Sequence, residues 1–127
     1  MSQVDAAGVS GEGRQVDGVT STRVSEQCVV VTPPGEIDTY SAPALRREIA
    51  AALTTPGVTL LVADLSRTTF LDSSALGALV GGLKRAREQD GRLVIVVPPG
   101  GVRRIFEITS LDRVFELYET VEQALDA

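Results

Sequence analysis

The chain has 127 residues, a length that suits one domain with a hydrophobic core rather than two. Its formal net charge of -5 argues against a general nucleic-acid binder, which needs a basic face. It contains no histidine, so a Ser-His-Asp triad and a histidine-based zinc site are both excluded. Cys28 is the single cysteine, so no intramolecular disulfide can form, and we interpret it as a small buried hydrophobe.

The first 23 residues are polar and show no sustained periodicity, so we expect a flexible tail over residues 1–23 and one domain over residues 24–127. They lack the apolar centre of a signal peptide, and no apolar run approaches the length of a membrane span. The sequence therefore predicts a cytoplasmic protein that does not contact a membrane.

The first half of the domain alternates between strand and helix patterns. Residues 28–32 are an apolar strand that Pro33-Pro34-Gly35 ends, either as an edge strand or at a bulge. Ser41 is placed to cap a helix, and Pro43 suits its first turn. Residues 58–64 are nearly continuously apolar, which is typical of a strand buried on both faces.

A long helix is predicted after Asp72, with Leu76, Leu79 and Leu83 on its apolar side and Gly91 beyond its end. The remaining elements are a strand at 93–97, a short helix around 102–106, a strand at 114–118 and a helix at 121–127. Strands that alternate with helices favour parallel pairs. We therefore expect a compact α/β domain, with a mixed sheet of about four or five strands and helices packed mainly on one side.

Asp72-Ser73-Ser74 lies where this helix begins. Free backbone amides and the helix dipole favour an anion at a helix N-terminus. Phosphorylation of a serine there would add about two negative charges beside a carboxylate. The local pattern is equally that of an ordinary N-cap, so by itself it leaves both interpretations open.

The ordered set of motifs resembles the STAS family, specifically its bacterial anti-sigma-factor antagonists. The matching segments are Gly35-Glu36-Ile37-Asp38, Val62-Ala63-Asp64-Leu65, the stretch from Phe70 to Gly77, the stretch from Val102 to Leu111, and Val114-Phe115. Together they span residues 24–127 in the family's order and spacing.

This resemblance implies a protein that, when unphosphorylated, binds an anti-sigma factor with serine-kinase activity and so frees a sigma factor. It implies that the kinase phosphorylates the serine after the aspartate of the D-S-[S/T]-G-L-G motif, and that a metal-dependent serine phosphatase removes the phosphate. By position the acceptor is Ser73, with Ser74 as the runner-up. The implied protein is not an enzyme, needs no cofactor or metal, and is a monomer or weak dimer.

The partner-binding residues implied by the matching motifs lie in two segments. They are Asp38, Thr39, Tyr40 and Ser41 in the first, and Asp72, Ser73, Ser74, Ala75, Gly77 and Ala78 in the second. Ala75 stands where the family usually has glycine, and its methyl group is expected to narrow the approach of a kinase. The small residues Gly77, Ala78, Gly81 and Gly82 suit either partner contact or close helix packing.

Four other functions are compatible with parts of this pattern. Asp38 and Asp72 are a carboxylate pair, but no third ligand accompanies them at recognisable spacing. A hydrolase with Ser73 as nucleophile lacks a nearby base, and a phospho-aspartate receiver at Asp64 lacks the lysine that should follow the later strand. A STAS scaffold or ligand-binding module that is not phosphorylated, in another signalling or membrane assembly, is the serious competitor, because a fold does not determine a partner.

Overall fold

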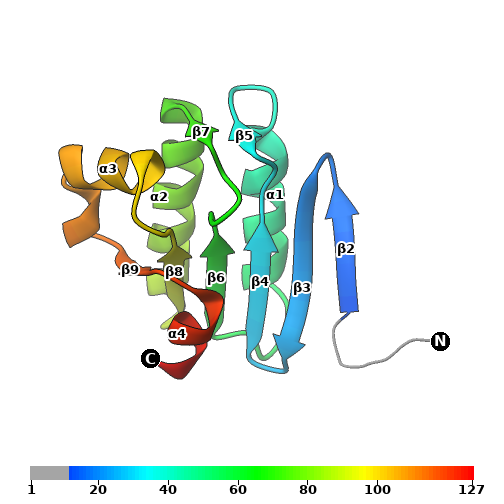
Figure 1. The fold of residues 1–127 in the computed structure, drawn as a ribbon. Helices are drawn as coiled ribbons and strands as arrows, with labels where there is room; N and C mark the ends of the chain where they lie inside the picture. Colours follow the sequence, from blue (N-terminus) through cyan, green and yellow to red (C-terminus); the bar gives the residue numbers. More distant parts are fainter. Residues whose placement is uncertain (1–11) are drawn as a thin grey trace.

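The computed structural model describes residues 12–127. In this part of the chain, strands and helices alternate after an N-terminal hairpin (Figure 1). The elements are β2 (Glu12–Val16), β3 (Val19–Ser25), β4 (Cys28–Thr32), β5 (Glu36–Ile37), α1 (Ala42–Leu53), β6 (Leu60–Asp64), β7 (Phe70–Leu71), α2 (Ser73–Glu88), β8 (Arg92–Val96), α3 (Gly101–Ile108), the 3-10 turn η1 (Leu111–Arg113), β9 (Glu116–Tyr118) and α4 (Val121–Asp126). None of the helices in residues 12–127 has the length and hydropathy needed to cross a membrane.

The main sheet has six strands in the order β2-β3-β4-β6-β8-β9. The pairs β2–β3 and β3–β4 are antiparallel, whereas β4, β6, β8 and β9 run parallel to one another. The predicted mixed α/β sheet is thus confirmed, but the predicted number of strands, four or five, is too low. Because β4 lies between β3 and β6, it is an internal strand, and Pro33-Pro34 ends it rather than marking an edge.

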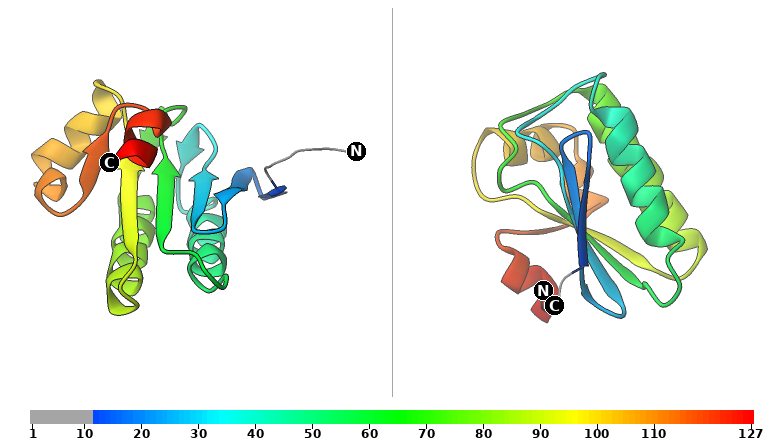
Figure 2. Two further views of the ribbon diagram at one scale, coloured as in Figure 1. Left: turned by 90° about the horizontal axis from the view of Figure 1, so that it is seen from below. Right: turned by 90° about the vertical axis from the view of Figure 1, so that its right-hand side faces the viewer.

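Successive side chains of the central strands point to opposite faces of the sheet, so the core has two layers. In β4, Val29 and Val31 belong to the larger apolar cluster, while Cys28 and Val30 belong to the smaller one on the opposite face. The helices α1 and α2 lie side by side over the first face, and α4 packs on the second (Figure 2). The expectation that helices pack mainly on one side therefore holds, and Cys28 is buried as predicted.

The predicted tail is wrong for residues 12–23, which form most of the β2–β3 hairpin; residues 1–11 lie outside the described part. Asp17 and Gly18 make the connecting turn with positive φ angles of 50° and 84°. Positive φ angles at both central residues are required by the type I′ turn, whose twist matches that of the two strands it joins. The dipeptide Asp-Gly strongly favours this turn. Because β3 is rich in Ser and Thr and only half-buried, it lacks the apolar run that marks a core strand.

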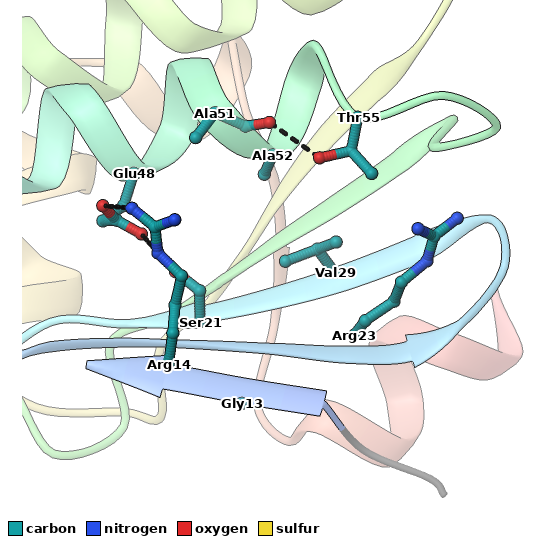
Figure 3. Close-up of a pocket in the computed structure, with 9 residues that line it drawn as sticks. All are labelled: Gly13, Arg14, Ser21, Arg23, Val29, Glu48, Ala51, Ala52 and Thr55. Atoms are coloured by element: carbon teal, nitrogen blue, oxygen red, sulfur yellow. Dashed lines mark hydrogen bonds and ion pairs between the residues drawn. The ribbon is translucent and has the colours of Figure 1, made fainter. Parts of the chain in front are cut away.

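An ion pair between the exposed Arg14 side chain and the buried Glu48 carboxylate connects the hairpin to α1. Both carboxylate oxygens of Glu48 accept hydrogen bonds from Arg14, at 2.9 Å and 2.7 Å, and the Ser21 hydroxyl lies 3.1 Å from one of them. Glu48 is only 2% exposed, so these partners offset the cost of removing its charge from water. The three residues border a hollow of about 230 Å³ between the hairpin and α1 (Figure 3).

Candidate functional site

Two short strands outside the main sheet bring the two predicted binding segments together. β5 pairs with β7 in parallel, with Ile37 opposite Leu71. The amide of Asp72 then donates to the carbonyl of Ile37 at 3.1 Å. As a result the loop that follows β5 and the first turn of α2 lie side by side at one edge of the domain (Figure 1).

Asp72, and not Ser73, caps α2. Its backbone is extended, and its carboxylate accepts hydrogen bonds from the amides of Ser74 and Ala75 at 2.9 Å and 3.2 Å. Ser73 is the first residue of the helix, and its side chain is exposed, whereas Ser74 is half-buried. The interpretation of Ser73 as a simple N-cap is therefore wrong, because the neighbouring carboxylate already performs that role.

Asp38 organises the facing loop. Its carboxylate accepts from the amides of Tyr40 and Ser41 at 2.9 Å and 3.1 Å. Donation by the Ser41 amide is the main cause that lowers the pKa of Asp38, with the Tyr40 amide and the Ser41 hydroxyl also contributing. Ser41 stands at the N-cap of α1 as predicted, but its hydroxyl accepts from the Asp38 amide at 3.0 Å instead of a helix amide. Asp38 and Ser41 therefore hold the loop in shape.

Four of the predicted contact residues are exposed at this edge. We call Thr39, Tyr40, Ser73 and Gly77 the docking face; Tyr40 is 94% exposed, and Gly77 lies one helical turn after Ser73. The predictions for Ala75 and Ala78 need correction, since these side chains are 0% and 1% exposed and belong to the core. The Ala75 methyl group points inward and so does not narrow the approach to Ser73.

Phe70 is a candidate contact residue that sequence reasoning missed. It lies on β7 opposite Glu36, three positions before Ser73, and it is 50% exposed. A half-exposed aromatic side chain beside an accessible site is typical of a protein interface. The sequence signal was an apolar residue in a two-residue strand, too short to show whether the side chain faces inward or outward.

The glycines of α2 divide into two kinds. A Cβ atom at Gly82 would stand 2.7 Å from Ile49 Cγ2 and 2.9 Å from Leu93 Cδ1, so Gly82 is needed for close packing. A Cβ atom at Gly77 would meet nothing within 4 Å, and one at Gly81 would meet only Arg46 Nη1 at 3.9 Å. Internal packing therefore requires Gly82 but does not require Gly77 or Gly81.

Asp38 and Asp72 do not form a carboxylate centre. Each uses its carboxylate to accept from backbone amides of its own loop or helix start. Among residues 12–127, no group of three or more acidic or cysteine side chains is arranged to hold a metal ion. The geometry instead presents an exposed serine and an exposed tyrosine on two segments joined by backbone hydrogen bonds, an arrangement suited to protein recognition.

Comparison with known proteins places this geometry in a family. The model of the STAS domain matches residues 20–124. The anti-sigma-B factor antagonist of Listeria monocytogenes is 34% identical over 83 residues, covering 65% of this chain and 72% of that protein.

Solved structures agree with this sequence similarity. The phosphorylated form of the Bacillus cell fate determinant SpoIIAA aligns with a TM-score of 0.68 and 26% identity, over 85% of this chain and 96% of that one. An anti-sigma factor antagonist from Mycobacterium paratuberculosis aligns with a TM-score of 0.65 and 31% identity, over 92% and 91%. The chain belongs to the STAS domain family. The relatives from Listeria monocytogenes and Mycobacterium paratuberculosis are named anti-sigma factor antagonists.

Proposed function

We propose that this protein is an anti-sigma-factor antagonist whose docking face binds an anti-sigma factor with serine-kinase activity and thereby frees a sigma factor. Phosphorylation of Ser73 ends that binding. The observation that carries the proposal is the position of Ser73: exposed, first in α2, and beside the Tyr40 loop. The structure of a relative, SpoIIAA, in its phosphorylated form supports the same chemistry.

The switch is electrostatic. Asp72 already occupies the amides of Ser74 and Ala75, so a phosphate on Ser73 does not gain these two donors and stays directed toward solvent. Attraction to the helix dipole stabilises it by about 0.3–1 kcal/mol. Like charges brought together across a protein interface cost several kcal/mol, so the interface effect is larger. Binding is lost while the fold is unchanged.

The finer parts of the proposal follow the family. A metal-dependent serine phosphatase removes the phosphate, and the protein works in the cytoplasm as a monomer or weak dimer. It acts by binding and has no catalytic activity of its own. Ser74 is the less suitable acceptor because its side chain is half-buried, while that of Ser73 is exposed.

Capture of partners from extracts of the native cell, with the unphosphorylated chain as bait, tests the class of partner. Recovery of an anti-sigma factor with kinase activity supports the proposal, whereas recovery of a membrane or scaffold protein alone supports the competing STAS scaffold. The captured kinase and ATP are then incubated with the chain, and intact mass is measured. One added phosphate is expected for wild type and Ser74→Ala, and none for Ser73→Ala.

Binding measurements with the same kinase test the switch. Ser73→Ala should bind and resist inactivation by ATP, whereas Ser73→Asp should bind more weakly. Ser74→Asp is the matched control, because it adds the same charge one residue away on a half-buried side chain. Equal affinity of the Ser73→Ala and Ser73→Asp variants would refute the electrostatic mechanism.

A further inference from the structure

The hollow between the β2–β3 hairpin and α1 has an apolar floor. Val29 of β4 and the methyl groups of Ala51 and Ala52 on α1 border it (Figure 3). Its volume is about 230 Å³. An apolar cavity of about 150 Å³ is large enough to hold benzene, so this hollow has room for a short hydrocarbon group.

Two guanidinium groups line the same hollow. The side chains of Arg14 and Arg23 both extend from the hairpin toward α1 (Figure 3). Arg14 donates from Nε and Nη2 to Glu48, and Arg23 donates from Nε and Nη2 to three backbone carbonyls at 2.6–3.2 Å. Within the described part of the chain, neither Arg14 Nη1 nor Arg23 Nη1 donates to another residue. Both guanidinium groups are therefore held in place and keep donors for a ligand.

The other polar side chains around the hollow already have partners. The Ser21 hydroxyl donates to Glu48 at 3.1 Å, and the Thr55 hydroxyl donates to the Ala51 carbonyl at 2.8 Å. The Glu48 carboxylate is almost fully buried and accepts from both Arg14 and Ser21. The free polar groups of the hollow are thus guanidinium donors, so the polar end of a matching ligand must accept hydrogen bonds.

The charge of the lining residues favours an anion. They include two arginines and one glutamate, which leaves one positive charge in a chain whose net charge is -5. Arg23 forms no ion pair with any side chain that the structure describes, although Glu12 stands opposite it in the β2–β3 register. Guanidinium groups bind both carboxylate and phosphate. A single carboxylate suits one surplus charge beside an apolar floor better than phosphate does, because phosphate carries up to about two charges and no hydrocarbon.

We propose that this hollow binds a small monocarboxylic acid with a short apolar body. The carboxylate accepts hydrogen bonds from Arg14 and Arg23, and the hydrocarbon lies against Val29, Ala51 and Ala52. None of the residues that line the hollow belongs to the docking face, so the proposal does not depend on the proposed antagonist function.

Titration of the full-length chain with hexanoate at constant ionic strength, followed by amide NMR, tests the proposal. Saturable shifts are expected at Ser21, Arg23 and Thr55. Acetate lacks the hydrocarbon and hexanamide lacks the charge, so each should bind at least about tenfold more weakly than hexanoate. Absence of saturable shifts with hexanoate at these residues would overturn the proposal. Equal affinity for hexanamide would refute the carboxylate assignment, and equal affinity for acetate would refute the apolar one.

Two substitutions change the hollow in different ways. Arg23→Met removes a guanidinium but keeps an unbranched side chain, and Ala51→Leu fills the hollow from an exposed position with little change of helix propensity. Each should weaken hexanoate binding roughly tenfold or more. Arg47→Met is the matched control, because it removes the same charge from a residue that does not line the hollow. Glu12→Gln removes a negative charge opposite Arg23 and should strengthen binding; weaker binding would contradict the proposed sign of the charge.

Thermal unfolding provides a second readout. Hexanoate should raise the melting temperature of wild type and of Arg47→Met by similar amounts, and that of Ala51→Leu by less. An equal rise in all three proteins would show that hexanoate binds elsewhere and would refute the assigned site. Wild-type affinity for hexanoate in both Arg23→Met and Ala51→Leu would refute it as well.

Discussion

Alanine at two glycines of α2 should have opposite effects on stability. In a helix interior alanine is more favourable than glycine by about 1 kcal/mol. At Gly77 nothing within 4 Å opposes the added methyl group, so Gly77→Ala should be more stable than wild type by about that amount. The gain is unopposed because the position faces solvent.

At Gly82 the same gain meets a steric cost. The new Cβ atom would lie 2.7 Å from Ile49 and 2.9 Å from Leu93, closer than carbon atoms approach without movement. Overpacking a core in this way costs about 1–3 kcal/mol, so Gly82→Ala should range from about neutral to about 2 kcal/mol less stable than wild type. The two variants should therefore differ by about 1–3 kcal/mol.

Urea unfolding monitored by circular dichroism measures both effects, provided that the m-value is the same in all three proteins. Partner affinity gives the second measurement. Gly77→Ala places a methyl group on the docking face, so it should bind the proposed anti-sigma kinase less tightly despite its greater stability. A Gly82→Ala variant as stable as Gly77→Ala would refute the packing argument, and unchanged affinity of Gly77→Ala would refute its place on the docking face.

Three further predictions concern the polar groups that shape the domain. Asp72→Ala should lower the free energy of unfolding by about 0.5–2 kcal/mol because it removes a helix cap, and Asp72→Asn should recover most of the loss in the same urea titration. Arg14→Leu removes two hydrogen-bond donors from the buried Glu48 carboxylate and should lower the free energy of unfolding by about 1–3 kcal/mol. Arg47→Leu breaks an exposed ion pair and should lower it by no more than about 1 kcal/mol. Similar losses of stability in the two variants would contradict the difference in burial between Glu48 and Asp17. Because folding lowers the pKa of Asp38, this carboxylate stabilises the fold fully above its ordinary pKa of about 3.9, and the stabilisation is lost as the pH falls through the lower folded pKa. Asp38→Asn should therefore flatten the acid end of a curve of unfolding free energy against pH. An unchanged curve would refute the role of Asp38 in that pH dependence.

The sequence predicted the parts of the fold whose pattern is local and strong. The strands at residues 28–32, 60–64 and 92–96 each contain a continuous run of at least four apolar residues. The helix α2 has a clear apolar side that begins after a capping aspartate. The observed ends of these strands differ from the predicted ends by only a residue or two. They differ because hydrogen bonding between strands, and not hydropathy, determines the last paired residue. The STAS resemblance drawn from the order of the motifs is confirmed by the match over residues 20–124.

What the sequence did not reveal depends on tertiary pairing. The β2–β3 hairpin buries few apolar side chains, so only the Asp17-Gly18 turn signalled it. β5 and β7 have two residues each, and they exist because each supplies the other with a partner. Burial of Ala75 and Ala78 follows from the way α2 packs on α1 and the sheet, which no local pattern of small residues determines.

The capping of α2 by Asp72 has a consequence for the lifetime of the proposed signal. A phosphoserine whose oxygens accepted hydrogen bonds from the amides of its own helix would be less accessible to an enzyme. Here two of those amides already donate to the Asp72 carboxylate, so a phosphate on Ser73 would remain accessible. Asp72, which caps the helix, would thereby also keep the proposed phosphate within reach of a phosphatase.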